Sequence, residues 1–249
     1  MKTIAILNQK GGVAKTTTAL NLGVYLANQG YKTLLVDIDA QANLTMGLGI
    51  EAPDKTIYDF FHKEPTIVTP IMSNLDLVPS TIEFAAIELE IINELQREQL
   101  LKKVIQQVEK KYDYCVIDCP PSLNMVTINA LTAAQSIIIP IEPSLYAYKG
   151  LDMMLSTINR VRESINSDLF ILGILITKHS ERTIAARKLS ERLQEKGLNV
   201  GLFDTKIRQS AELRNAEDKQ MNIFASAPNS SAAADYSAFA KEVVTKLNK

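Results

Sequence analysis

A short stretch near the amino terminus has the composition of a loop that binds nucleotide phosphates. It lies between an apolar run, Thr3–Leu7, and an amphipathic stretch, Thr16–Asn28, and it reads Lys10, Gly11, Gly12, Val13, Ala14, Lys15, Thr16, Thr17. Adjacent glycines allow a tight turn that aims backbone N–H groups at one point, and a following helix adds its unpaired N–H groups and the positive end of its dipole. At this spacing Lys15 reaches the β- and γ-phosphates, and the Thr16 hydroxyl is a ligand for Mg²⁺. The segment predicts a phosphate loop between a strand and a helix.

Three aspartates follow apolar runs that are typical of buried parallel strands. Lys32–Val36 is followed by Asp37 and Asp39, and Tyr114–Ile117 is followed by Asp118. The carboxyl ends of parallel strands meet at one edge of a sheet, so we expect these carboxylates to lie beside the phosphate loop. Carboxylates in that position can bind a metal ion and orient a water molecule. We expect Asp118 to hold Mg²⁺ through water.

The loop departs from the general phosphate-loop pattern G-x-x-x-x-G-K-[ST], because Gln9 and Ala14 stand where the outer glycines belong. It resembles the deviant Walker A motif, K-G-G-x-[GA]-K-T, of the ParA/MinD/nitrogenase-iron-protein group of ATPases. The resemblance implies ATP and Mg²⁺ as cofactors, with ATP held by residues 10–17. It also implies that Lys10 acts across a dimer interface on the nucleotide of the partner subunit. A positive φ at Ala14 would cost alanine about 1 kcal/mol, and we expect nucleotide binding to survive it.

The other two patches resemble the same family. The segment Asp37–Thr45 is similar to D-x-D-P-Q-G-N-x-T of Soj-type ParA proteins, with Ala40 for the family's proline and Ala42 for its glycine. This implies that Asp39 orients the attacking water and that Asp37 supports the magnesium shell. Asp118 begins a D-x-P-P-S pattern that is also the family's. Three motifs in the family's order and spacing predict a P-loop ATPase.

The resemblance runs over essentially the whole chain, including a closing segment at Pro228–Tyr236. Larger ParA relatives carry a helix-turn-helix region ahead of the ATPase domain, whereas nine residues precede Lys10 here. The chain is therefore expected to be a short, Soj-like partition ATPase for plasmids or chromosomes, without operator-specific DNA binding. The family implies an ATP-dependent homodimer that holds double-stranded DNA non-specifically and releases it on hydrolysis. It also implies weak intrinsic activity, stimulated by a ParB-like partner.

The resemblance also indicates where DNA and the adenine base bind. Soj-type proteins place DNA-binding arginines after the strand matching Ile171–Thr177, where Arg182 stands, and in the segment matching Thr205–Ala216. Glu212 replaces one family arginine there, so Arg208 or Arg214 is the candidate for that contact. Contacts of this kind bind phosphates, weaken steeply with salt and ignore sequence. Thr177 and Arg208 are the candidates for the adenine pocket.

Composition sets the frame for these motifs. The chain has 249 residues, is 46% hydrophobic, and carries a formal net charge of −1 with a pI of about 6.2, so DNA contact must come from a local patch. Helix-length segments separate its apolar runs, which are Thr3–Leu7, Thr33–Val36, Leu75–Val78, Tyr114–Ile117, Ile137–Ile141 and Ile171–Ile176. This alternation predicts one α/β domain over residues 1–249, with a doubly wound, mostly parallel sheet and helices on both faces.

The same sequence leads us to expect a cytoplasmic, nucleoid-associated protein with no membrane partner. The first strand begins almost at Met1, which leaves no room for a signal peptide, and no apolar run approaches the roughly 20 residues of a membrane span. The run Glu83–Lys111, with Leu89, Ile92, Leu95 and Leu100 among charges, favours a pair of amphipathic, core-packing helices.

Three alternatives share the phosphate loop. A MinD-like membrane-cycling ATPase needs a basic amphipathic tail, but the core can use the apolar residues of Phe239–Lys249. A reductase like the nitrogenase iron protein needs paired cysteines at the dimer interface. Cys115 is expected inside a strand, which leaves only Cys119. A metabolic enzyme such as dethiobiotin synthetase needs further catalytic groups, and the two histidines, His62 and His179, fall in no recognisable constellation.

Overall fold

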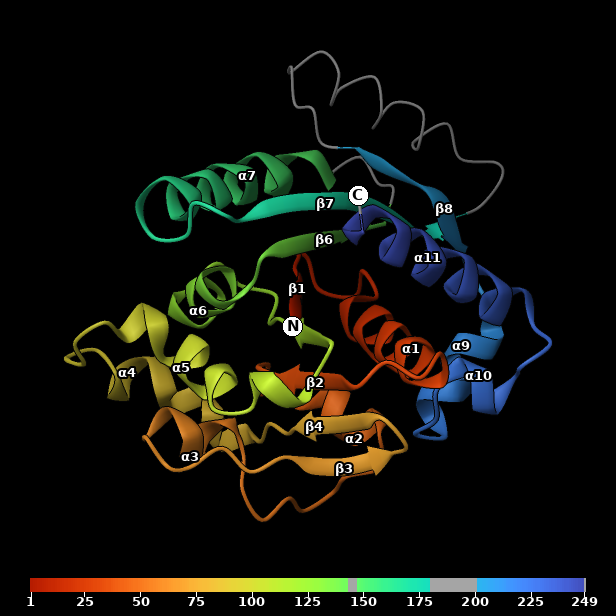
Figure 1. Cartoon of the computed structure of the whole chain (residues 1–249). Helices are drawn as coiled ribbons and strands as arrows, with labels where there is room; N and C mark the ends of the chain where they lie inside the picture. The colour runs from red at the N-terminus through yellow and green to blue at the C-terminus, as the bar shows by residue number, and fades with distance from the viewer. Residues whose placement is uncertain (143–146, 180–200, 249) are drawn as a thin grey trace.

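The computed structural model describes residues 1–142, 147–179 and 201–248. An eight-stranded sheet crosses the molecule in the order β3-β4-β2-β5-β1-β6-β7-β8, and helices cover both of its faces (Figure 1). All neighbouring strands pair in parallel except β3 and β4, which are antiparallel. The strands are β1 (Lys2–Ile6), β2 (Thr33–Asp37), β3 (Thr69–Met72), β4 (Leu75–Val78), β5 (Tyr114–Asp118), β6 (Ser136–Ile141), β7 (Phe170–His179) and β8 (Leu202–Arg208).

The helices divide between the two faces of the sheet. The described α-helices are α1 (Lys15–Asn28), α2 (Asn43–Gly47), α3 (Ile57–Phe61), α4 (Ile87–Glu90), α5 (Leu100–Gln106), α6 (Met125–Ala133), α7 (Ala147–Ser164), α9 (Ala211–Asp218), α10 (Ile223–Ser226) and α11 (Ser231–Leu247). Short 3₁₀ turns add η1 (Ile82–Ala86), η2 (Arg97–Gln99) and η3 (Glu109–Lys111). Figure 1 shows α5, α6 and α7 on one side of the sheet and α1 and α11 on the other.

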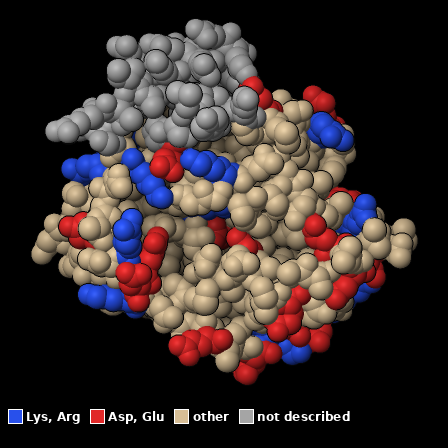
Figure 2. Space-filling model, turned by 180° about the vertical axis from the view of Figure 1, so that it is seen from behind, with Lys and Arg blue, Asp and Glu red and all other residues tan. Residues whose placement is uncertain are grey.

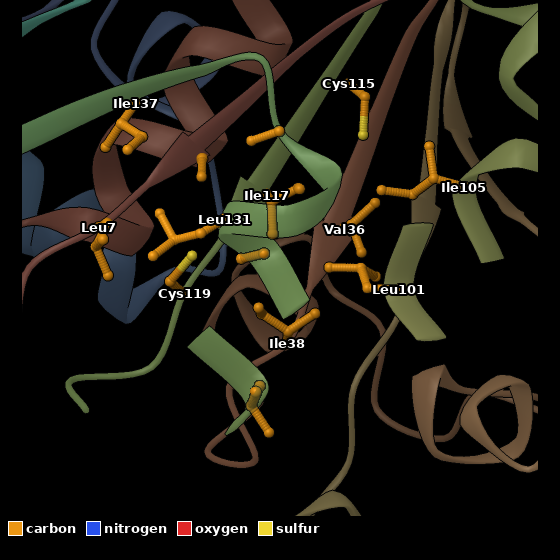
Figure 3. Packing of buried hydrophobic residues seen from close by; sticks show 14 of the residues in the cluster. Leu7, Val36, Ile38, Leu101, Ile105, Cys115, Ile117, Cys119, Leu131 and Ile137 are labelled. Atoms are coloured by element: carbon orange, nitrogen blue, oxygen red, sulfur yellow. The ribbon is translucent and has the colours of Figure 1, made fainter. Parts of the chain in front are cut away.

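Alternation along the central strands builds two separate cores. Side chains of Ala5 and Leu7 enter a cluster with α3, α5, α6 and α7, and those of Ile4 and Ile6 enter a second cluster with α1 and α11. Figure 3 shows the first cluster, in which strand residues such as Ile117 meet helix residues such as Leu131. A central strand buried on both faces explains why these segments read as continuous apolar runs.

All six predicted strands are present, and the predicted α/β class is confirmed. The sequence missed two strands at opposite edges of the sheet. β3 contains Pro70, which cannot donate to a ladder and is tolerated at an edge. β8 alternates buried and exposed residues, with Phe203 and Ile207 buried and charged residues between them. Edge strands lack the unbroken apolar run that revealed the central ones.

The prediction of two core-packing helices over Glu83–Lys111 was wrong in its first half. That part of the chain forms η1, the single turn α4, and η2, and its large side chains are exposed: Leu89 by 78% and Leu95 by 88%. Ile92 is also exposed, whereas Leu100 is buried as expected. α4 ends at Glu90, and Gln96 adopts a left-handed conformation, with φ 57°, at the N-cap of η2, so the chain is not helical between α4 and η2. Amphipathic spacing alone did not reveal that break.

The carboxyl-terminal helix belongs to the core. Phe239 and Val243 of α11 are fully buried against the second cluster, and Val244 and Leu247 are partly buried there. Both cysteines are buried and unpaired, as expected for structural thiols. Among the described helices, none is long and apolar enough to cross a bilayer.

Candidate active site

The phosphate loop occupies the turn between β1 and α1, as the sequence predicts. Two of its residues have left-handed backbone conformations, Gly12 with φ 72° and Ala14 with φ 65°. Ala14 is the N-cap of α1, and its side chain makes no capping hydrogen bond to the first turn. The N–H groups of that turn are therefore available to an anion at the positive end of the helix dipole.

Two side chains hold the loop in place. The Asn8 amide donates to the carbonyl oxygen of Pro140 at 2.6 Å, and its Oδ1 accepts from the Lys10 N–H at 2.9 Å. Buried Thr177, on β7, donates its hydroxyl to the carbonyl oxygen of Val13 at 3.1 Å. Thr177 thus braces the loop by its hydroxyl. The sequence reasoning gave Asn8 no role.

Asp37 and Asp118 meet at the carboxyl ends of adjacent strands. They are direct partners in the β2–β5 register, and both are fully buried. Asp37 accepts hydrogen bonds from the Thr45 N–H (2.9 Å), the Thr45 hydroxyl (2.8 Å) and the Asp39 N–H (3.1 Å). Burial nevertheless raises the pKa of Asp37 to about 6. Thr45, the last residue of the D-x-D segment, therefore fixes the position of this carboxylate.

Asp118 is the less satisfied of the two carboxylates. Neither of its oxygens accepts a well-formed hydrogen bond from another part of the described chain. Burial, and then the charge of Asp37, raise the pKa of Asp118, while the nearby Thr16 hydroxyl and Lys15 ammonium lower it. The buried Lys15 side chain therefore lies near the Asp118 carboxylate. A buried carboxylate with orphaned oxygens needs a cation or a proton.

These residues fit a magnesium ion that arrives with a nucleotide. Among the described residues, no group of three or more His, Cys, Asp or Glu side chains is arranged to hold a metal. Mg²⁺ keeps several waters and is usually bound by one or two carboxylates together with phosphates. The orphaned oxygens of Asp118, with Asp37 and the Thr16 hydroxyl beside them, match that pattern.

Asp39 stands at the opening of this buried pair. It is only partly buried, and its Oδ1 accepts from the Gln41 N–H at 3.0 Å while its own N–H donates to Asp37. Its position in an open turn next to the buried pair Asp37 and Asp118 leaves its carboxylate accessible to water. Ala42 ends this turn in a left-handed conformation, with φ 52°. Ala14, which replaces a glycine of the general phosphate-loop pattern, and Ala42, which replaces a glycine of the family, therefore both lie at left-handed positions.

Lys10 lies at the open side of the loop. Its ammonium is 3.5 Å from the Glu142 carboxylate, and both side chains are partly exposed. An exposed pair of this kind is worth at most about 1 kcal/mol. The Lys10 side chain can therefore exchange Glu142 for a stronger anionic partner.

A cavity of about 120 Å³ adjoins the phosphate loop at the carboxyl ends of β7 and β8. We call it the strand-end cavity; its lining is Ala14, Thr17, Thr177, Lys178, Ile207, Arg208, Gln209, Ser210, Leu213, Arg214 and Glu217. Ligands of open α/β sheets bind at such strand ends. Both candidate adenine residues, Thr177 and Arg208, belong to it.

The candidate DNA-binding arginines have different surroundings. Arg208 donates from Nε (2.9 Å) and Nη2 (2.6 Å) to the two carboxylate oxygens of Asp235. This fork-shaped contact is the strong geometry for arginine. Arg214 is exposed on α9. Arg182 lies outside the described residues.

The fold and the site define a P-loop protein with a deviant Walker A motif, and comparison with known proteins narrows the class. A family model described as "AAA domain" matches residues 1–171. The sporulation initiation inhibitor protein Soj of Bacillus subtilis is 42% identical, over 97% of this chain and 98% of its own length. The chromosome-partitioning ATPase Soj of Treponema pallidum is 37% identical, over 98% of each chain. The chain belongs to the ParA/Soj-type partition ATPases.

Solved structures share the fold across different activities. Cobyrinic acid a,c-diamide synthase from Mycobacterium smegmatis, with ADP and magnesium bound, superposes with a TM-score of 0.87 at 29% identity, covering 100% of this chain and 96% of the other. A plasmid partition protein of Borrelia burgdorferi bound to AMPPNP gives a TM-score of 0.80 at 26% identity, covering 99% and 98%. The same fold therefore occurs in a synthase and in a partition protein. The identity to the Soj relatives, at 42% and 37%, shows to which of these families this chain belongs.

The strained alanines give a first prediction. Glycine in place of Ala14 or Ala42 removes the left-handed penalty and adds backbone entropy to the unfolded chain, so each variant should gain about 0.5–1 kcal/mol of unfolding free energy. Urea denaturation measures it. Ala238→Gly, at an exposed position inside α11, is the control and should lose about 1 kcal/mol. Equal losses of unfolding free energy in all three variants would contradict the claim that Ala14 and Ala42 are strained.

The buried carboxylates give a second prediction, for the protein without nucleotide or Mg²⁺. A carboxyl group whose pKa rises on folding stabilises the fold at low pH, and that contribution is lost as pH rises from about 4 through the folded pKa. Asp118→Asn removes the buried charge, so the variant should exceed wild type by about 1 kcal/mol at pH 8 and match it near pH 4.

Urea denaturation at the two pH values measures this difference. Asp168→Asn, an exposed carboxylate just before the amino end of β7, is the matched control and should have the same stability as wild type at both pH values. An Asp118→Asn variant that is less stable than wild type at pH 8 would refute the account.

Proposed function

We propose that this chain is a ParA/Soj-type ATPase for plasmid or chromosome partitioning that works as an ATP-dependent homodimer on non-specific DNA. One observation carries the proposal: a phosphate loop of the deviant type faces two buried carboxylates, with Lys10 on the open side. ATP and Mg²⁺ are its cofactors. Hydrolysis ends the dimeric state and releases the DNA.

Each residue of the site has one role in hydrolysis. The backbone of residues 10–17 and the Lys15 ammonium bind the β- and γ-phosphates. Thr16, Asp118 and Asp37 would hold Mg²⁺, and the bound ion would neutralise charge on the phosphates. Asp39 orients the attacking water toward the γ-phosphate. The hydrogen bond between the Asp39 N–H and Asp37 keeps the water-orienting and metal-holding carboxylates in fixed relation.

Lys10 supplies the contact that makes hydrolysis depend on dimerisation. In the single subunit it pairs with Glu142 at 3.5 Å. In the dimer each Lys10 reaches the γ-phosphate of the partner subunit, a more highly charged and less exposed anion. Loss of that phosphate weakens the interface, so the dimer equilibrium is biased by one phosphate group.

The adenine base occupies the strand-end cavity. This cavity shares Ala14 and Thr17 with the phosphate loop, so a nucleotide bound at the loop extends directly into it. Thr177 and Arg208 form two of its walls. Since the Thr177 hydroxyl is already donated to Val13 and Arg208 is anchored to Asp235, both residues shape the cavity more than they bond the base.

Because the net charge of the chain is −1, DNA would have to bind at a local basic surface. Figure 2 shows several Lys and Arg side chains in the upper left of one face, with Asp and Glu side chains among them, while Asp and Glu side chains prevail along its lower edge. Arg214 and Arg182 are the proposed phosphate contacts. Arg208 is the weaker candidate, because Asp235 neutralises it. Phosphate contacts of this kind carry no sequence information.

A ParB-like protein is the proposed activator, and the nucleoid in the cytoplasm is the proposed location. The family membership supports both. The buried apolar face of α11 favours this cycle over a MinD-like cycle on a membrane, because that face already packs in the core. The buried positions of Cys115 and Cys119 oppose an iron–sulfur site shared between subunits.

The proposal predicts DNA retention that needs ATP and low salt. In an Asp39→Ala background, which slows hydrolysis, light scattering should show a dimer with ATP and Mg²⁺, and an unrelated DNA fragment should retain it at about 50 mM salt but not at about 200 mM. Arg214→Ala should lower retention without changing the dimer. Arg160→Ala, exposed on α7, removes the same charge and should leave retention unchanged.

A dimer that ignores DNA at both salt concentrations would contradict the partition role and favour the membrane-cycling or metabolic alternatives. Equal losses in Arg214→Ala and Arg160→Ala would contradict the proposed surface, because a general change in net charge would then explain the result.

A further inference from the structure

One contact joins the phosphate loop helix to α9 and has no role in the mechanism above. The Thr17 hydroxyl donates to the Glu217 carboxylate at 2.5 Å, across 200 residues of sequence. Thr17 is the third residue of α1, and Glu217 lies near the end of α9. Glu217 is exposed, and it lines the cavity beside the loop.

Glu217 stands at the border between two hollows. It lines the strand-end cavity together with Ala14 and Thr17. It also lines a groove of about 340 Å³ between α1, α2 and α9, which includes Asp218 but lacks Ala14. The carboxylate is therefore at the mouth of the proposed base cavity, at the place where that cavity adjoins the first turn of α1.

A bound nucleotide must place its sugar at this border. The phosphates occupy the loop and the first turn of α1, and the base occupies the strand-end cavity. The ribose connects the two, so it passes the side chains common to both regions, and Thr17 is one of them. Glu217, hydrogen-bonded to Thr17, is the carboxylate that meets the sugar there.

We propose that Glu217 accepts hydrogen bonds from the ribose hydroxyls of the bound nucleotide and so makes the site selective for ribonucleotides over deoxyribonucleotides. An ionised carboxylate only accepts, and the 2′- and 3′-hydroxyls are the donors that the sugar offers. Dinucleotide-binding folds use an acidic residue on the ribose hydroxyl for the same chemical reason. The Thr17 hydroxyl orients the carboxylate from the loop side.

The alternative role for the Glu217 carboxylate, repulsion of the nucleotide phosphates, predicts a different result. A carboxylate next to the phosphates themselves would repel them, and removing it would tighten binding. Selectivity for the sugar predicts the reverse, because the lost acceptor would weaken binding of the ribonucleotide alone. The inference rests on the proposed position of the base and is independent of DNA binding and dimerisation.

Calorimetric titration with Mg²⁺ and ADP, 2′-deoxy-ADP or 3′-deoxy-ADP tests the inference without hydrolysis. Wild type should bind ADP about tenfold or more tightly than at least one deoxy analogue, the size expected for a hydrogen bond to a charged acceptor. Glu217→Ala should lose that factor for ADP, keep the affinity of wild type for the deoxy analogue, and so bind both alike. Glu217→Gln, which keeps one acceptor oxygen, should retain part of the discrimination.

Asp218→Ala is the matched control. It removes the same charge from the adjacent position of α9, outside the strand-end cavity, and should discriminate the sugars as wild type does. Three results would overturn the inference: wild type that does not distinguish the sugars, Glu217→Ala that still does, or Glu217→Ala that binds every nucleotide more tightly. Because no DNA or dimer is measured, a failure of the partition proposal would leave these results unchanged.

Discussion

Two like-charged carboxylates buried at the ends of adjacent strands are the constraint on which the rest of this structure depends. The register places Asp37 directly opposite Asp118, in a position where neither can be solvated. Thr45 and the Asp39 N–H satisfy Asp37, whereas the oxygens of Asp118 remain without partners. An uncompensated buried charge is strongly destabilising, and a divalent cation bound with phosphates would compensate it. The free protein thus holds a site of unfavourable electrostatics that bound Mg²⁺ and nucleotide would relieve.

Backbone strain is the second cost that this site carries. Ala14 and Ala42 both adopt left-handed conformations, one at the start of α1 and one at the start of α2. Each turn brings N–H groups and carboxylates to the same edge of the sheet, so the fold keeps a geometry that glycine would adopt more easily. Strain that persists at functional positions is held by the surrounding structure. Here the hydrogen bonds of Asn8 and Thr177 hold the loop that contains Ala14.

Residues at the carboxyl ends of parallel strands could be placed from the sequence. Contacts between segments that are distant in the sequence could not. Lys15, Asp37 and Asp118 could be placed together because the ends of parallel strands share one edge, and the structure brings them together. Asn8 bonds Pro140, and Thr17 bonds Glu217, across separations that no local pattern reveals. The same limit explains β3 and β8, whose edge positions lack an apolar run. It also explains Leu89 and Leu95, whose helical spacing suggested burial that short, broken turns do not provide.

The central claim is that nucleotide and Mg²⁺ together compensate the buried carboxylate pair. Thermal unfolding of the protein with ADP alone, Mg²⁺ alone and both together tests it most directly, since each ligand stabilises only as far as it binds the folded state. We predict that the midpoint rises far more with both ligands than the sum of the two separate shifts. It should rise little with Mg²⁺ alone. Additive shifts, or a full shift with ADP in the absence of Mg²⁺, would contradict the claim.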